Sequence, residues 1–328
     1  MSSVLISRLL TGVVFVMGLP SMGTVLGQQT QPAGPLQASV EGYRIPNTEV
    51  FDLKSKDGRD YRIFVAKPDG DPPPPGYPVL YVLDANAYFS LAASLNRLRS
   101  RDPKTRALVV GIGYPIDGTF DMKRRTFDLT TKASPEKLPP SRGGEGWPES
   151  GGADHFLNFI LGELKPLIAE KYSANSARQA IVGHSFGGLF VMHTFFTKPD
   201  AFQAYVAISP SGWWNDYALL AEEKTFAKNI DKMKSPVELL IEVGQLELAG
   251  NAGPTASLAP TPASREFGST TEFANRLMQL DSKALTVKYQ EFEGKDHGSV
   301  VPPAMIEAFQ FAFPPSHRSA PAVPPVSR

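Results

Sequence analysis

The chain has 328 residues, no cysteine and a formal net charge of zero, with 33 basic and 33 acidic residues. The lack of cysteine excludes disulfides, thiolate metal sites and a cysteine nucleophile, which leaves serine as the obvious nucleophile for covalent chemistry. Because no basic stripe is interleaved with aromatic residues, we expect no nucleic-acid partner.

The first 27 residues have the features of a secretory signal peptide. Arg8 precedes an apolar stretch, residues 9–26, that glycines and a proline interrupt, and Gly27 ends it before polar residues. One basic residue, a broken apolar segment and a small residue at the exit are typical of cleavage after Gly27, with an uncleaved anchor as the alternative. No later stretch is long and apolar enough to span a membrane. We therefore expect an exported mature chain, in the periplasm or the medium.

Residues 41–313 are expected to form one domain after a flexible lead-in at residues 28–40. Two β-rich runs flank a Lys-Asp-Gly turn and predict a hairpin, and apolar runs then alternate with helix-length segments. The predicted strands are residues 48–53, 61–66, 79–83, 107–112, 180–182, 205–208, 237–243 and 285–289. This order predicts a mostly parallel central sheet with an antiparallel N-terminal hairpin and helices on both faces. The Pro-rich tail, residues 314–328, is expected to be disordered.

The pentapeptide Gly183-His184-Ser185-Phe186-Gly187 is the most informative motif. It follows an apolar strand-like run and precedes a run of small and then apolar residues that predicts a helix. Strand, G-x-S-x-G and helix, in this order, are what the nucleophile elbow of an α/β-hydrolase requires. Glycines two residues before and after the serine remove Cβ atoms that would clash in so sharp a turn. The motif therefore predicts an α/β-hydrolase fold with Ser185 as nucleophile.

His297 is the predicted general base. It follows the last expected strand and precedes a helix near Pro302, so its loop returns to the carboxyl edge of the sheet. The other histidines are less suited. His184 adjoins the nucleophile and points away from it, His193 lies more than two helical turns further on, His155 opens a helix, and His317 lies in the tail.

The acid that orients the base is expected just after the strand at residues 237–243, where Glu247 lies. Glu242 lies inside that strand, and Glu266 is a rival in the following loop. Asp296 is adjacent to the base, which makes good geometry hard. A Ser–His dyad without an acid is the further alternative.

Two backbone N–H groups are expected to bind the oxyanion of the tetrahedral intermediate. One belongs to Phe186, and the other to Ala85 or Asn86 in the turn after the strand at residues 79–83. A structural role, closing its own turn, is the alternative for Asn86. Two long irregular connections, residues 116–153 and 245–268, are expected to form the walls of the substrate site.

Six segments together resemble the putative-esterase branch of the α/β-hydrolases, over residues 42–313. They are YPVLYVLDANAYF, VVGIGYPIDGTFDMKRRTFDLT, FLNFILGELKPLI, GHSFGG, ISPSGWWND and GKDHGS. Known members of this branch include siderophore esterases acting on enterobactin, salmochelin and bacillibactin. The LDAN turn departs from the many relatives with glycine after the aspartate, and the position of the acid varies within the branch.

The resemblance implies that Ser185 is the nucleophile, that His297 is the base and that Arg125 reaches toward the substrate. It also implies that Trp213 or Trp214 lines the site. The alternatives are a solvated Arg124–Arg125 pair on a loop, and a core position for one of the two tryptophans.

We therefore expect a serine carboxylic-ester hydrolase that works through an acyl-enzyme and needs no metal or organic cofactor. The expected substrate is a small-molecule ester, foremost a catecholate siderophore trilactone in its ferric form. An acetyl or feruloyl carbohydrate ester is the enzymatic alternative, and a catalytically silent ligand-binding module on the same fold is the non-enzymatic one.

Overall fold

The computed structural model describes residues 42–141, 144–233, 235–248 and 259–315, and those from Arg44 onward belong to one compact unit. The predicted signal peptide and lead-in, and the predicted tail beyond its first two residues, lie outside the described residues. None of the helices in the described part has the length and hydropathy needed to cross a bilayer.

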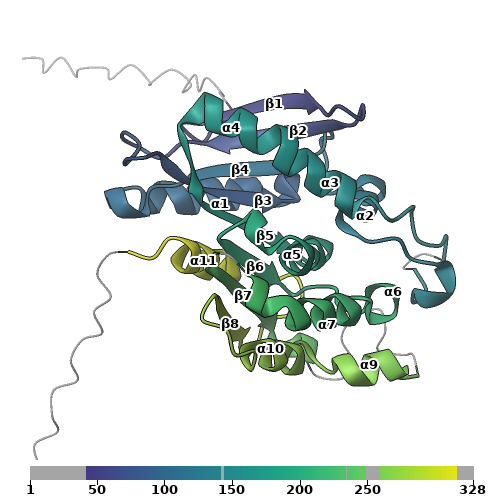
Figure 1. Cartoon of the computed structure of the whole chain (residues 1–328). Coiled ribbons are helices and arrows are strands. Elements are labelled where there is room, and N and C mark those ends of the chain that lie inside the picture. Colours follow the sequence, from purple (N-terminus) through teal and green to yellow (C-terminus); the bar gives the residue numbers. More distant parts are fainter. Residues whose placement is uncertain (1–41, 142–143, 234, 249–258, 316–328) are drawn as a thin grey trace, which may run out of the picture. The chain divides into compact units, whose positions relative to one another are not determined.

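Eight strands form one sheet in the order β1-β2-β4-β3-β5-β6-β7-β8 (Figure 1). They are β1 (Thr48–Lys54), β2 (Asp60–Ala66), β3 (Tyr77–Leu83), β4 (Leu108–Gly113), β5 (Ala174–His184), β6 (Ala204–Ile208), β7 (Val237–Gly244) and β8 (Leu285–Phe292). β2 pairs antiparallel with β1 and β4, and all other neighbouring strands are parallel. The predicted α/β-hydrolase architecture is confirmed, including the antiparallel N-terminal hairpin.

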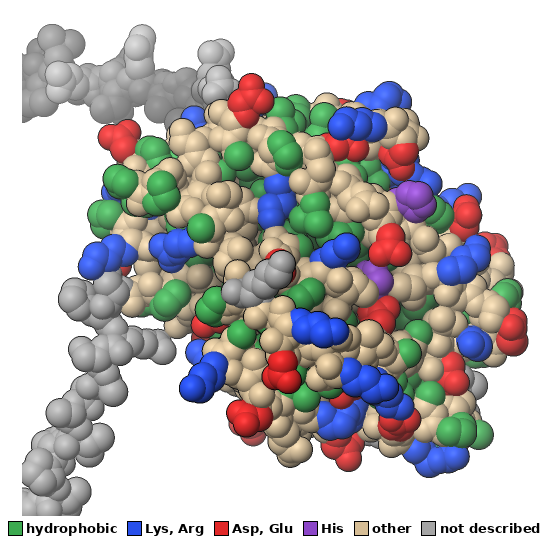
Figure 2. Space-filling model, viewed as in Figure 1, with side chains coloured by type: hydrophobic (Ala, Val, Ile, Leu, Met, Phe, Trp, Pro, Cys, Tyr) green, Lys and Arg blue, Asp and Glu red, His purple; other side chains and the backbone are tan. Residues whose placement is uncertain are grey.

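From β3 onward, helices connect successive strands, and helices cover both faces of the sheet. They are α1 (Ala85–Arg99), α2 (Met122–Leu129), α3 (Ala153–Phe159), α4 (Lys165–Tyr172), α5 (Phe186–Thr197), α6 (Trp214–Tyr217), α7 (Leu219–Asn229), α8 (Gln245–Leu248), α9 (Pro262–Phe267), α10 (Thr270–Met278) and α11 (Val301–Ala312). A π-helical turn, Ile160–Leu164, joins α3 to α4. On the side seen in Figure 2, acidic and basic side chains are interleaved.

The sheet separates two apolar cores, because successive side chains of a strand point to opposite faces. In β3, Tyr81 packs in the cluster that contains side chains of α3, α5, α7 and α10, whereas the next residue, Val82, packs in the cluster of α1 and α11. Every residue of β3 is buried. Continuous apolar runs in the sequence therefore mark strands covered by helices on both sides.

The turn from β5 to α5 is strained in the way that a nucleophile elbow requires. Ser185 has φ 61° and ψ −116°, a conformation that residues with a side chain rarely adopt. A Cβ atom on Gly183 would lie 2.4 Å from the backbone carbonyl of Gly187, and one on Gly188 would lie 2.9 Å from the Ile208 oxygen. A Cβ on Gly187 would meet nothing closer than 3.5 Å. The prediction that the turn requires glycine is thus confirmed at Gly183 and wrong at Gly187. The second position where a Cβ atom would clash with backbone is Gly188.

Gly183→Ala is expected to lower the free energy of unfolding by about 1–3 kcal/mol, because the new methyl group meets backbone that cannot move aside. Gly187→Ala, the matched control, adds the same methyl group where space exists, and its effect should stay within about 0.5 kcal/mol. Urea unfolding of the two variants measures the difference. Equal losses of stability would contradict the steric account of the elbow.

Candidate active site

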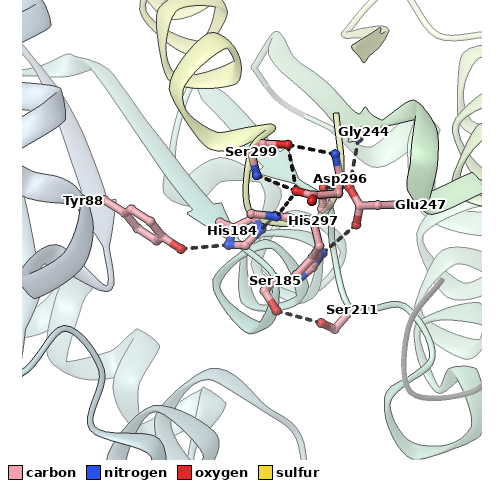
Figure 3. Close-up of polar contacts among 11 residues, drawn as sticks. Tyr88, His184, Ser185, Ser211, Gly244, Glu247, Asp296, His297 and Ser299 are labelled. Atoms are coloured by element: carbon pink, nitrogen blue, oxygen red, sulfur yellow. Dashed lines mark hydrogen bonds and ion pairs between the residues drawn. The ribbon is translucent and has the colours of Figure 1, made fainter. Parts of the chain in front are cut away.

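Three parallel strands bring their following loops together at the carboxyl edge of the sheet. Ser185 follows β5, Glu247 lies in α8 after β7, and His297 lies between β8 and α11. The ring of His297 packs against the ring of His184, with 4.5 Å between centroids, so it lies next to the residue that precedes Ser185. Figure 3 shows the His297 ring between Ser185 and Glu247.

A short hydrogen bond of 2.6 Å joins His297 Nδ1 to Glu247 Oε2. The other carboxylate oxygen of Glu247 accepts from the Ser209 hydroxyl at 2.6 Å and from the Gly244 N–H at 2.9 Å. Burial alone would raise the pKa of Glu247, but the hydrogen bonds from His297 and Ser209 outweigh it and lower that pKa. Glu247 is therefore a carboxylate that accepts a hydrogen bond from the Nδ1–H group of His297, so Nε2 is the nitrogen that can take a proton.

The other carboxyl groups weighed from the sequence do not reach His297. Glu266 pairs with Lys224 on α7. Glu242 is fully buried in β7 with no hydrogen-bond partner among the described residues, and burial raises its pKa, which favours the neutral form. Asp296 accepts from the N–H groups of Gly298 and Ser299 and so caps the turn that carries His297. Of the four candidates, Glu247 is the one in contact with the imidazole.

The Ser185 hydroxyl lies 3.3 Å from the hydroxyl of Ser211, which is its hydrogen-bond partner in this structure. The backbone joins the same two segments, because the Ser211 N–H donates to the Ser185 oxygen at 3.2 Å. Either hydroxyl can be the donor, so the Ser185 proton is available for His297 when Ser211 donates.

The backbone N–H groups predicted as oxyanion donors lie at two helix starts. Phe186 begins α5, and Ala85 and Asn86 begin α1, where N–H groups have no partner within the helix. The side chain of Asn86 is structural, because its Oδ1 accepts from the Tyr114 N–H and its Nδ2 donates to the Tyr114 oxygen, at 2.8 and 2.9 Å. The side chain thus has a structural role, but it binds the distant Tyr114 backbone and does not close its own turn as the alternative predicted. The backbone N–H groups remain the candidate donors. The described residues contain no cluster of three His, Asp or Glu side chains arranged for a metal ion.

Arg125 does not reach toward a substrate, so that expectation is wrong. Its Nε and Nη2 donate to the two carboxylate oxygens of Asp84 at 2.9 Å each, and only 6% of its surface is exposed. The rings of Phe120 and Phe186 lie 5.3 and 5.1 Å from the guanidinium carbon. Because Asp84 immediately precedes α1, the ion pair holds the turn that carries the predicted oxyanion donors. Asp84 was missed, although an acid directly after a wholly apolar strand needs a buried partner.

The two tryptophans have different roles, in agreement with the alternative that one of them is a core residue. Trp214 is 1% exposed and donates Nε1–H to the Thr131 oxygen, so it is core and does not line the site. Trp213 is partly exposed and lines a cavity beside Glu247. Trp147, which the sequence analysis did not single out, lies 5.5 Å from Trp213 between ring centroids.

The cavity has a volume of about 500 Å³, and parts of both long connections line it together with Glu247, whereas Ser185 and His297 do not. That these connections form the walls of the substrate site stays a prediction. Its lining includes Glu136, Lys137, Leu138, Pro139, Pro210, Gly212, Trp213, Asp216, Tyr217, Glu247, Leu248, Ala259, Pro260, Thr261, Ser264 and residues 267–270. Asp216 and Tyr217 belong to a turn in which three consecutive residues have φ between 49° and 59°. Strained turns of this kind are concentrated at ligand sites.

A serine on a strained strand-to-helix turn, with a histidine whose second nitrogen is held by a carboxylate, defines a serine hydrolase. The chain belongs to the family described as "Putative esterase", whose model matches residues 55–318.

Two relatives match most of the chain. It is 38% identical to the "Ferri-bacillibactin esterase BesA" of Bacillus subtilis, over 83% of this chain and 92% of the relative. It is 33% identical to the "Siderophore triacetylfusarinine C esterase" of Aspergillus fumigatus, over 78% and 90%. Among solved structures, the BES protein of Bacillus cereus superposes with a TM-score of 0.72 at 32% identity, covering 84% of this chain and 99% of the other. The protein is thus a serine carboxylic-ester hydrolase.

Proposed function

We propose that Ser185, His297 and Glu247 form the catalytic triad. The observation that carries this assignment is the 2.6 Å hydrogen bond between Glu247 and the histidine that packs beside the elbow. In the first half-reaction, Ser185 Oγ attacks the ester carbonyl carbon while its proton passes to His297 Nε2. The oxyanion is held by the N–H groups of Phe186 and of the Ala85 turn. Collapse of the tetrahedral intermediate breaks the bond between the carbonyl carbon and the leaving oxygen. That oxygen takes the proton from His297 and departs as an alcohol.

Water completes the cycle by the same groups. His297 removes a proton from water as the water oxygen attacks the acyl-enzyme carbonyl, and the second oxyanion occupies the same N–H groups. Collapse returns the proton to Ser185 Oγ and releases the acid. Glu247 stabilises the imidazolium that forms in both halves, without taking the proton itself.

The proposed substrate is a siderophore ester, with a ferric catecholate trilactone as the first choice. The names of the relatives support this class, and a further relative, from Emericella nidulans, is the "Siderophore enterobactin esterase". The side chains of Trp213 and Tyr217 line the cavity and suit an aromatic arm. Arg125 is bound to Asp84 and does not face the cavity. Lys137 is the cationic side chain among the described lining residues, and we propose that it faces the anionic complex.

A substrate panel tests this proposal. The chain should hydrolyse a ferric catecholate trilactone with a kcat/KM about 10–200-fold above that for a feruloylated sugar, the range that pocket contacts usually supply. Lys137→Met should lower kcat/KM for the anionic trilactone while leaving that for a neutral p-nitrophenyl ester unchanged. A preference for the sugar ester would replace the siderophore assignment with the carbohydrate one.

We propose further that the chain is exported to the periplasm or the medium after cleavage at Gly27. The support is the pattern of Arg8, the broken apolar segment and the small exit residue. The intact mass of the exported protein tests this, since the mature chain should begin at Gln28. A mass that includes residues 1–27 would mean an uncleaved anchor.

A further inference from the structure

His184, the residue before the nucleophile, joins three elements of the site. Its Nε2 lies 2.7 Å from the backbone oxygen of His297, and its Nδ1 lies 2.9 Å from the hydroxyl of Tyr88 on α1 (Figure 3). His184 is 6% exposed, whereas the side chain of His297 is 51% exposed. The base therefore lies on an open loop whose backbone is bound to a buried ring next to Ser185.

The partners of His184 determine its protonation state. A backbone oxygen can only accept, so Nε2 of His184 carries the proton, and Nδ1 must then accept from the Tyr88 hydroxyl. Burial, and next the charge of the neighbouring His297, lowers the pKa of His184 to about 3. The ring is consequently neutral and keeps a single tautomer. A second cation 4.5 Å from His297 would oppose the imidazolium that forms there during catalysis.

Other contacts also fix this loop, and those from Glu247, Asp296 and β7 do not tie the base to the nucleophile strand. Glu247 binds the far side of the His297 ring, and Asp296 caps the turn. The backbone of β7 is pressed against the loop, since a Cβ on Gly244 would lie 2.4 Å from the Lys295 oxygen. The hydrogen bond from His184 is the link that spans from the elbow to the His297 backbone.

We propose that His184 and Tyr88 are positioning residues that hold His297 at reacting distance from Ser185. The inference rests on the triad proposed above. Tyr88 fixes the His184 tautomer, and it lies in the first turn of α1, whose N–H groups are the proposed second oxyanion donors. The Tyr88–His184 pair thus links the oxyanion turn, the elbow and the base loop.

A matched pair of substitutions tests the link. In His184→Gln, the side-chain amide reaches the position of Nε2 and can donate to the His297 oxygen, whereas the shorter amide of His184→Asn cannot. On a p-nitrophenyl ester, His184→Asn should lower kcat about 10–100-fold with KM nearly unchanged, since small misplacements of reacting groups cost rates of this order. His184→Gln should recover most of kcat, and Tyr88→Phe should lower kcat about fivefold, the effect of one ordinary hydrogen bond.

The controls separate this inference from the triad and from folding. His155→Asn makes the same change on the exposed face of α3 and should leave kcat as it is. Equal kcat for His184→Asn and His184→Gln, or a loss confined to KM, would overturn the positioning role. If His184→Asn does not fold, an unchanged kcat in Tyr88→Phe overturns it instead. Activity retained in Ser185→Ala would refute the triad itself, whereas loss there with normal His184 variants refutes only the positioning role.

Discussion

Ser185→Ala is expected to lower kcat on a p-nitrophenyl ester by roughly 10⁴–10⁶-fold, with the protein still folded. The substitution removes the attacking oxygen. The elbow backbone stays in place, with the hydrogen bond from the residue-185 N–H to the Ile208 oxygen. The residual rate should come from binding and the oxyanion donors alone. Steady-state kinetics of the variant measures the loss of kcat, and a urea unfolding curve shows whether the protein is still folded.

Ser211→Ala is the matched control, because it removes the hydroxyl that lies 3.3 Å from Ser185 Oγ. Its effect should not exceed about tenfold in kcat, since one ordinary hydrogen bond is lost and no reacting group. A large loss of kcat in Ser211→Ala, together with retained activity in Ser185→Ala, would mean that Ser211 and not Ser185 is the nucleophile.

Glu247→Gln is expected to lower kcat by roughly 10³–10⁴-fold, as for neutral replacements of the acid in other triads. The amide keeps the shape of the side chain, but it removes the charge that stabilises the imidazolium and allows His297 to adopt the wrong tautomer. The Ser209 and Gly244 donors would also face a group that accepts less strongly. kcat and the stability of the variant should be measured together.

Glu266→Gln is the control for this prediction, because Glu266 was the rival acid and pairs with Lys224 at the surface. Exposed ion pairs contribute little, so kcat and stability should hardly change. A wild-type kcat in Glu247→Gln would instead support a Ser–His dyad.

Local patterns in the sequence were sufficient to predict the sheet and the chemical groups at its edge. Apolar runs identify strands buried on both faces, and the G-x-S-x-G motif between strand and helix locates Ser185. The place of His297 after the last strand follows from the fold. Glu247 is close enough in sequence to the end of β7 for the same reasoning to select it.

Partners far apart along the chain could not be predicted in this way. The Arg125–Asp84 pair joins residues 41 positions apart, and His184 binds Tyr88 and His297 over 96 and 113 positions. Arg125 carries the same charge whether it faces a ligand or a buried acid, so its sequence context does not distinguish the two. The same holds for Trp213 and Trp214, whose exposure depends on α6 and on the loop that packs against it.

The most direct test is to label the folded protein with a fluorophosphonate and to map the adduct by peptide mass spectrometry. The probe forms a covalent bond with a serine only where a base activates it, so the single adduct should lie on Ser185 and should be lost in His297→Ala. An adduct on another residue, or undiminished labelling of Ser185 without His297, would contradict the proposed triad.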